Sequence, residues 1–180
     1  MQQNDSLRNV AIIAHVDHGK TTLVDALFKQ SGVFRADQRV DDRVMDKMDL
    51  ERERGITIAA KNCAVRWKGV KINIIDTPGS DDFCGGLFSA FRVADVGVML
   101  LNAQNGFEVG TEIQARYARR HEKPIIAVIN QLDHEKASWE GALDSLKAAS
   151  QVTPVVVQYP VNPGPGFDAF VDVLLMKMYR

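Results

Sequence analysis

The stretch AIIAHVDHGKTT, residues 11–22, constrains the fold of this chain more than any other. The apolar run at residues 10–13 predicts a buried strand, a short polar loop follows it, and Lys20 and Thr21 open a helical pattern. A strand, a glycine-containing loop, Lys-Thr and a helix in this order are typical of a phosphate-binding loop. The match has one defect, because Ala14 stands where the pattern has its first glycine. Taken alone, the stretch is also compatible with an ordinary strand-to-helix turn.

A loop of this kind holds a polyphosphate mainly with its backbone. The N–H groups of six consecutive residues would point at the phosphates, with the positive end of the helix dipole behind them. These residues are Asp17, His18, Gly19, Lys20, Thr21 and Thr22. The Lys20 ammonium would lie between the β- and γ-phosphates, and the Thr21 hydroxyl would ligate Mg²⁺.

Beyond this loop, predicted strands and helices alternate along the chain. We expect strands at residues 9–14, 56–67, 70–75, 96–101, 124–129 and 155–159, and helices at 21–30, 87–93, 108–121, 136–149 and 167–178. The alternation, with one hairpin near the front, predicts an α/β fold whose mostly parallel sheet is covered on both faces. Right-handed crossovers bring the strand ends to one edge, so residues 14–22, 76–79 and 130–133 should gather there.

Two more strand ends carry polar motifs. Asp76 directly follows an apolar strand, where its carboxylate can orient a water on Mg²⁺, and the Gly79 N–H can approach a γ-phosphate because no Cβ blocks it. Alone, this Asp-x-x-Gly is also compatible with a plain turn. Asn130 and Asp133 follow a later strand, and the Asp133 carboxylate can accept from the N1–H and the 2-amino group of guanine together. Adenine would leave that carboxylate unpaired, which is costly.

The charged segment at residues 33–54 has no sustained apolar period, so it is either functional or disordered. Thr57 follows it in the sequence Arg54-Gly55-Ile56-Thr57. It is the candidate for a mobile threonine that closes on Mg²⁺ and the γ-phosphate.

Together these motifs make the sequence resemble the GTP-binding domain of translational GTPases, through AHVDHGKTT, ERERGITI and DTPG. Residues 1–79 are similar to TypA/BipA, a ribosome-associated GTPase, and residues 80–180 are similar to an elongation factor G paralogue. A mosaic or an engineered chimera would show such a division. The resemblance implies a P-loop G domain of three layers around a six-stranded, mostly parallel sheet. It also implies that residues 1–180 are one GTP-binding domain of a larger multidomain factor, with residues 160–180 beginning an inserted subdomain.

The resemblance further assigns roles to individual residues. Residues 17–22 would hold the phosphates of GTP or GDP, and Gly79 would sense the γ-phosphate. Thr21 and Thr57 would ligate Mg²⁺ with Asp76 nearby, and Val16 and Ile56 would flank the attacking water. The guanine-reading loop would consist of Asn130, Gln131 and Asp133. Switch I would comprise residues 34–57 and switch II residues 79–92.

Three positions depart from the family pattern. Ser80 follows Gly79 where the family has the histidine that positions the hydrolytic water, and a serine side chain is too short to reach that water. Gln131 stands where a lysine is usual, which predicts weaker retention of the nucleotide. The Ser-Ala loop that normally backs the guanine is not recognisable, and residues 159–162 occupy the corresponding place.

Charge and composition restrict the partners. Lys plus Arg (22) nearly balance Asp plus Glu (23), so no global field recruits DNA or an anionic membrane. Two cysteines make neither a disulfide framework nor a zinc site, and no apolar run is long enough for a membrane span. We therefore expect a cytoplasmic monomer whose partners are guanine nucleotide and, through the resemblance, the ribosome.

Three functions follow from these features. The first is a GTPase whose hydrolysis is slow or depends on the ribosome. The second is a GTP-dependent binding switch whose hydrolysis is vestigial, which Ser80 favours. The third, a P-loop ATPase or nucleotide kinase, is disfavoured by Asn130 and Asp133.

Overall fold

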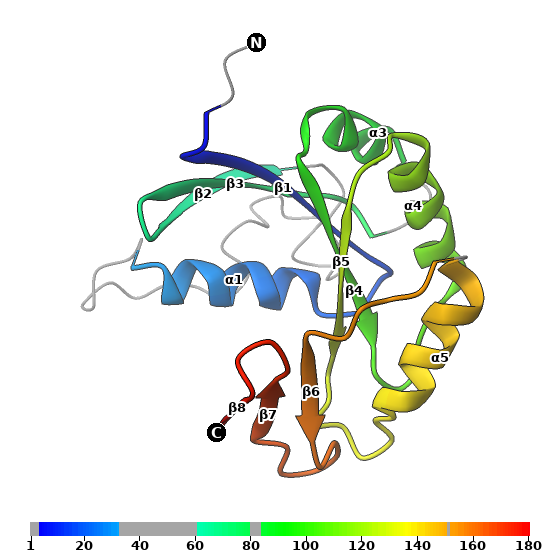
Figure 1. The fold of residues 1–180 in the computed structure, drawn as a ribbon. Coiled ribbons are helices and arrows are strands. Elements are labelled where there is room, and N and C mark those ends of the chain that lie inside the picture. The colour runs from blue at the N-terminus through cyan, green and yellow to red at the C-terminus, as the bar shows by residue number, and fades with distance from the viewer. Residues whose placement is uncertain (1–3, 33–60, 80–83, 151) are drawn as a thin grey trace, which may run out of the picture.

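The computed structural model describes residues 4–32, 61–79, 84–150 and 152–180. Within them lies a five-stranded sheet in the order β2-β3-β1-β4-β5. Its strands are β1 (Leu7–Ala14), β2 (Lys61–Trp67), β3 (Val70–Asp76), β4 (Val96–Asn102) and β5 (Ile125–Asn130). Four of them run parallel, and β2 pairs antiparallel with β3 as the predicted hairpin (Figure 1). The expected mostly parallel α/β sheet is confirmed.

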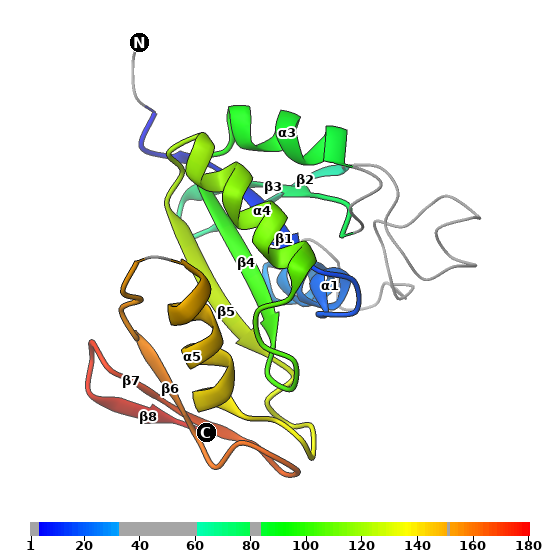
Figure 2. The same ribbon diagram turned by 90° about the vertical axis from the view of Figure 1, so that its right-hand side faces the viewer.

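Helices cover both faces of this sheet. Helix α1 (Lys20–Gln30) lies on one face, and α3 (Cys84–Val93), α4 (Val109–Arg120) and α5 (Trp139–Ser150) lie on the other (Figure 2). The predicted three layers are therefore confirmed. In the described ranges no helix has the length and apolar character needed to cross a membrane.

The continuous apolar runs of β1 and β4 explain the two cores. Along a strand, successive side chains point to opposite faces, so a run without polar residues can be buried on both sides. Ala11 and Ile13 pack with the α3, α4 and α5 side, where Phe91 of α3 is fully buried. Ile12 and Ala14 belong to the second core, under α1.

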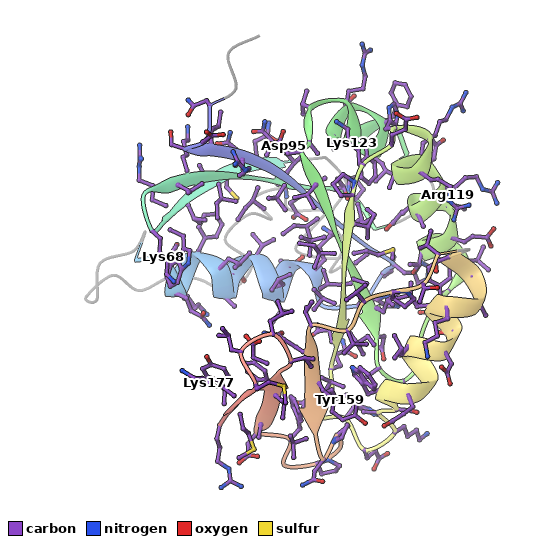
Figure 3. All side chains as sticks on the ribbon, viewed as in Figure 1. Lys68, Asp95, Arg119, Lys123, Tyr159 and Lys177 are labelled. Carbon is purple, nitrogen blue, oxygen red and sulfur yellow. The ribbon has the colours of Figure 1, made fainter. Side chains whose placement is uncertain are left out.

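The sixth strand predicted for this sheet is absent from it in the described part of the chain. The strand expected at residues 155–159 is displaced to β6 (Gln158–Val161), and β6 pairs with β7 (Ala169–Asp172) in a separate three-stranded sheet, β6-β7-β8. Pro160 lies within β6, and because proline lacks a backbone N–H it suits an edge strand such as this one. Tyr159 of β6, labelled in Figure 3, contacts Trp139 of α5, and their ring centroids are 4.5 Å apart.

The helix predicted at residues 167–178 is wrong: this segment forms β7 and β8 (Lys177–Tyr179), joined by a turn. Asp172 causes the turn, because its Oδ1 accepts hydrogen bonds from the backbone N–H groups of Leu174 (3.0 Å) and Leu175 (2.9 Å). Met176 then adopts a left-handed conformation with φ of 51°, which a helix does not tolerate.

The other predicted elements lie within a few residues of their observed bounds. Only residues 61–67 of the strand predicted at 56–67 are described. The small C-terminal sheet occupies the region expected to begin an inserted subdomain, and that assignment stays a prediction.

Candidate nucleotide-binding site

The three loops expected to gather at one edge of the sheet do so, and they contact one another directly. Asn130 Nδ2 donates to the His18 carbonyl oxygen, and Gln131 Nε2 donates to the Asp17 carbonyl oxygen, both at 2.9 Å. Lys20 Nζ forms an ion pair with Asp76 Oδ1. The ends of β1, β3 and β5 are thus connected around the N-terminus of α1.

The loop after β1 has the backbone shape of an anion-binding turn. Asp17 and Gly19 adopt left-handed conformations, with φ of 64° and 88°. A Cβ on Gly19 would collide with Asn130 Nδ2, so this position requires glycine for its space as well as for its φ. Gly19 is also the N-cap of α1 and supplies no side-chain cap, which leaves the positive end of the helix directed at a ligand.

Ala14, the defect in the sequence pattern, causes no difficulty in the structure. It is the last residue of β1 and is fully buried, so it has extended backbone and needs no glycine. Its carbonyl oxygen accepts a hydrogen bond of 3.0 Å from Gln114 Nε2 of α4. The strand end is therefore anchored to the neighbouring helix.

The loop after β3 places a buried carboxylate beside the lysine. Asp76 is 0% and Lys20 7% exposed, and the Thr77 hydroxyl holds the strand end by donating to the Ile12 carbonyl at 2.8 Å. At Gly79 a Cβ would lie 3.0 Å from the Ala14 carbonyl oxygen, so the absence of a side chain lets this loop approach the first one closely.

A Mg²⁺ ion fits these donors. Mg²⁺ in nucleotide sites takes one or two hard protein oxygens and completes its shell with phosphates and water. The carboxylate of Asp76 and the hydroxyl of Thr21 offer such oxygens at one end of α1. In the described ranges no three His, Cys, Asp or Glu side chains gather into a metal site of their own, so the nucleotide would have to supply further ligands.

Asn102 is a site residue that we did not identify from the sequence. It ends β4, and its Nδ2 donates to Gln131 Oε1 at 2.6 Å while its Oδ1 accepts from the Gln104 backbone N–H at 2.7 Å. Gln131 thereby links Asn102 to the Asp17 carbonyl. A lysine at this position could donate to the Asp17 carbonyl, but it has no oxygen to accept the hydrogen bond from Asn102. Asn102 follows an apolar strand just as Asp76 and Asn130 do, and that signal could have revealed it.

We expect Gln131→Ala to speed the dissociation of GDP by roughly 10–30-fold, because the link from Asn102 through Gln131 to the Asp17 carbonyl loses two hydrogen bonds of about 1 kcal/mol each. Stopped-flow release of a fluorescent GDP analogue measures the rate. The control is Gln104→Ala, since the bond from Gln104 to Asn102 comes from its backbone and survives the change. An unchanged rate in Gln131→Ala would show that the link does not restrain the loop.

The residues expected to read the base differ in their exposure. Asn130 is half-buried and committed to the phosphate loop, whereas Asp133 is exposed in the turn that follows β5. Behind this turn, the Gly164 N–H donates to the Leu132 carbonyl at 2.7 Å. The segment after β6 therefore contacts the loop in the region where the family's Ser-Ala loop was not recognisable.

A second residue missed from the sequence, Glu108, contacts the phosphate loop from the start of α4. Its Oε2 lies 2.5 Å from His18 Nε2. Burial by itself raises the pKa of the Glu108 carboxyl. Hydrogen bonds from His18 and Asn105 and the charges of His18 and His15 together lower it by more, so the net pKa lies below its usual range. Glu108 is separated by 90 positions from His18, and no sequence signal pairs them.

The remaining residues of interest fall into two groups. Ile56, Thr57 and Ser80 lie outside the described residues, as does the whole of the predicted switch I, residues 34–57. Val16 and Thr21 are half-buried in or next to the loop, and Thr22 is exposed. Burial and the nearby Asp76 charge raise the pKa of the Cys63 thiol in β2 to about 12, which disfavours the thiolate form.

A mostly parallel sheet with a phosphate loop after its first strand, a buried Asp at the end of its third and an Asn-x-x-Asp turn that begins at the end of its fifth defines the class of P-loop G domains. Within that class the chain belongs to the family described as the elongation factor Tu GTP binding domain, which it matches over residues 5–178.

Several relatives show how far the similarity extends. The chain is 45% identical over 146 residues to the large ribosomal subunit assembly factor BipA of Bacillus subtilis, covering 81% of this chain and 24% of that protein. It is 41% identical over 170 residues to the mitochondrial ribosome-releasing factor 2 of Danio rerio, covering 93% of this chain and 22% of that protein. A solved structure from Thermus thermophilus superposes with a TM-score of 0.86 at 27% identity, covering 98% of this chain and 27% of that one. The chain thus spans about a quarter of the length of these relatives.

Both kinds of relative expected from the sequence are therefore present. A match of 146 residues in a chain of 180 necessarily crosses residue 79, so the likeness to BipA is not confined to residues 1–79. The division of the chain into two parts of different origin stays a prediction.

Proposed function

We propose that this chain binds GTP and GDP with Mg²⁺ and changes conformation with the nucleotide, as the G domain of a ribosome-associated translation factor. The observation that carries the proposal is the direct bonding of the β5 loop to the phosphate loop, through Asn130 to His18 and Gln131 to Asp17. A base-reading element and a phosphate-reading element joined in this way suit one ligand that contains both a base and a polyphosphate.

Each part of the site has a task in this proposal. The positive end of α1 and the Lys20 ammonium bind the phosphates, and Gly79 allows its N–H to meet the γ-phosphate. Thr21 and Asp76 hold Mg²⁺, which when bound neutralises charge on the phosphate oxygens. Asp133 reads guanine, with Asn130 fixing the position of the loop.

The ribosome is the proposed partner, because the relatives above are named for ribosomal subunit assembly and for ribosome release. We propose the cytoplasm as the compartment and a monomer as the working form. The near balance of charge, 22 basic against 23 acidic side chains, gives no long-range attraction to DNA.

Hydrolysis is the weaker half of the proposed activity. The chain's family is one of GTPases, but Ser80 replaces the histidine that positions water, so we propose slow or ribosome-dependent hydrolysis. The second candidate, a switch driven by GTP binding alone, rests on the same residue. An ATPase would leave the Asp133 carboxylate without its partner.

Calorimetric titration with GDP, GTP and ATP in the presence of Mg²⁺, followed by a single-turnover hydrolysis assay, tests the proposal. We expect binding of both guanine nucleotides and none of ATP at the same concentrations. Equal binding of ATP and GTP would remove the guanine assignment, and the hydrolysis rate separates the enzyme from the binding switch.

We expect the predicted switch I, residues 34–57, to exchange its amide hydrogens quickly in the nucleotide-free and GDP forms and more slowly with a non-hydrolysable GTP analogue. The reason is that Thr57 has a γ-phosphate and Mg²⁺ to bind only in the GTP form. Hydrogen exchange followed by mass spectrometry measures the difference, and peptides of β4 serve as an internal reference. Strong protection in the nucleotide-free chain would contradict a switch.

A further inference from the structure

The His18 ring lies buried between the phosphate loop and the segment that connects β4 to α4. Its side chain is 1% exposed. Nδ1 lies 3.1 Å from the Leu100 carbonyl oxygen, and Nε2 lies 2.5 Å from Glu108 Oε2. The His15 ring meets it edge-on, with centroids 5.6 Å apart. The imidazole therefore faces one acceptor oxygen at each nitrogen.

Two acceptors require two protons. The Leu100 carbonyl has no hydrogen to give, so Nδ1 must donate to it. A second proton must then lie between Nε2 and Oε2, because two lone pairs at 2.5 Å would repel each other. The pair is either an imidazolium with a carboxylate or a neutral ring with a carboxylic acid, and both forms keep one proton between Nε2 and Oε2.

The position of Glu108 shows that its carboxylate is committed to this contact. Glu108 is the N-cap residue of α4, with extended backbone at φ −99° and ψ 167°, yet its side chain makes no capping hydrogen bond. Serine, threonine, aspartate or asparagine would stabilise the helix better at this position. The carboxylate instead turns to His18 and also lies 3.4 Å from Asn105 Nδ2.

The contact between Glu108 and the His18 ring lies at the centre of the turn in the phosphate loop. His18 lies between Asp17 and Gly19, both in left-handed conformations, and its own carbonyl receives the Asn130 bond. The ring is buried and held at both of its nitrogens, so it fixes the position of the turn from the interior side. The backbone of this turn is the part proposed to meet the phosphates.

We propose that Glu108 is a positioning residue for the nucleotide: it holds the His18 ring, and through the ring it keeps the phosphate loop in its binding conformation. This rests on the proposed function, since it assumes that the loop binds a guanine nucleotide. It makes the segment between β4 and α4 a fourth component of the site, beside the loops after β1, β3 and β5.

A double-mutant cycle tests whether Glu108 acts through His18. We expect Glu108→Ala to weaken GDP binding about tenfold, since a short, part-buried hydrogen bond to the His18 ring is lost. In a His18→Ala background the same change should have no further effect. Glu108→Gln should bind within about threefold of the parent, because its amide can donate to Nε2 of a neutral ring. The matched control is Glu112→Ala, an exposed carboxylate on the same helix whose pair with Arg116 lies at the surface.

Nitrogen-15 NMR of the histidines gives a readout that a general loss of stability would not produce. The parent should show a strongly downfield proton signal at His18 Nε2 from the proton shared with the Glu108 carboxyl, and Glu108→Gln should lack that signal while Nδ1 keeps its bond to the Leu100 carbonyl. This measurement still decides the matter if an alanine variant fails to fold, because neither form requires that variant.

The outcomes separate the two proposals. A parent chain that binds no guanine nucleotide would defeat the proposed function. Three results would overturn only the role of Glu108 while the parent still binds guanine nucleotide. They are an unaffected Glu108→Ala, an equal effect of this change in the His18→Ala background, and the absence of a shared proton at Nε2 in the parent.

Discussion

Asp133→Asn is expected to lower the affinity for GDP and GTP by roughly 10²–10³-fold and to raise the affinity for xanthosine nucleotides. The carboxylate is proposed to accept from both N1–H and the 2-amino group of guanine, and an amide cannot accept both. An amide donor suits the 2-oxo group of xanthine instead. Because Asp133 is exposed, the substitution leaves the core intact and reports on recognition alone.

The measurement is a competition titration of GDP against xanthosine diphosphate on both proteins. Asp144→Asn is the matched control, since Asp144 is an exposed carboxylate of α5 that pairs with Lys147 at 2.9 Å. A variant that keeps its affinity for GDP, or that loses GDP without gaining xanthosine diphosphate, would show that guanine is read elsewhere.

Ser80→His is expected to raise single-turnover hydrolysis of GTP by roughly 10²–10⁴-fold, the usual contribution of a positioned proton-transfer or water-orienting group. In the proposed site, Lys20, the start of α1 and Mg²⁺ neutralise charge on the phosphates, and with Ser80 in place of the family's histidine no residue of this loop is proposed to position the water. Gly79 lies against the Ala14 carbonyl in the loop proposed to meet the phosphates, and residue 80 is its covalent neighbour.

The assay uses saturating GTP, so that rapid release of nucleotide through the altered Gln131 loop does not hide the chemistry. Ser89→His, the same change on the exposed side of α3, controls for an added imidazole. A parent that already hydrolyses GTP at the rate of an activated GTPase would contradict the prediction, as would a Ser80→His variant no faster than its parent.

The two predictions address separate parts of one connected site. Asn130 and Gln131 bond the base loop to residues 17 and 18, and Glu108 holds the same turn from the other side. A change at the base loop should therefore also alter the rate at which the phosphates leave. Measuring release rates together with affinities in every variant would show whether the loops act as a unit.

Much of the fold could be predicted from the sequence because its signals are local. Neighbouring residues alone define the apolar runs of β1, β4 and β5 and the Lys-Thr start of α1. The polar motifs stand next to three of the strands in the sequence, so they are recognised in the same local way. Parallel strands with right-handed crossovers then require those loops to meet at one edge. That reasoning predicts that Asp76, Asn130 and Gln131 lie together at this edge, as they do.

Other features were decided by tertiary contacts. Residues 167–178 have an apolar pattern that suits a helix, yet the Asp172 turn and pairing with β6 make them a hairpin. The partners of Gln131 and His18, namely Asn102 and Glu108, lie 29 and 90 positions away in the sequence. A hydrogen bond between distant residues depends on where the sheet carries them, and neither residue alone carries a motif. The sequence by itself therefore determined the sheet edge and its phosphate loop, whereas only the folded chain decided which side chains hold that loop in place.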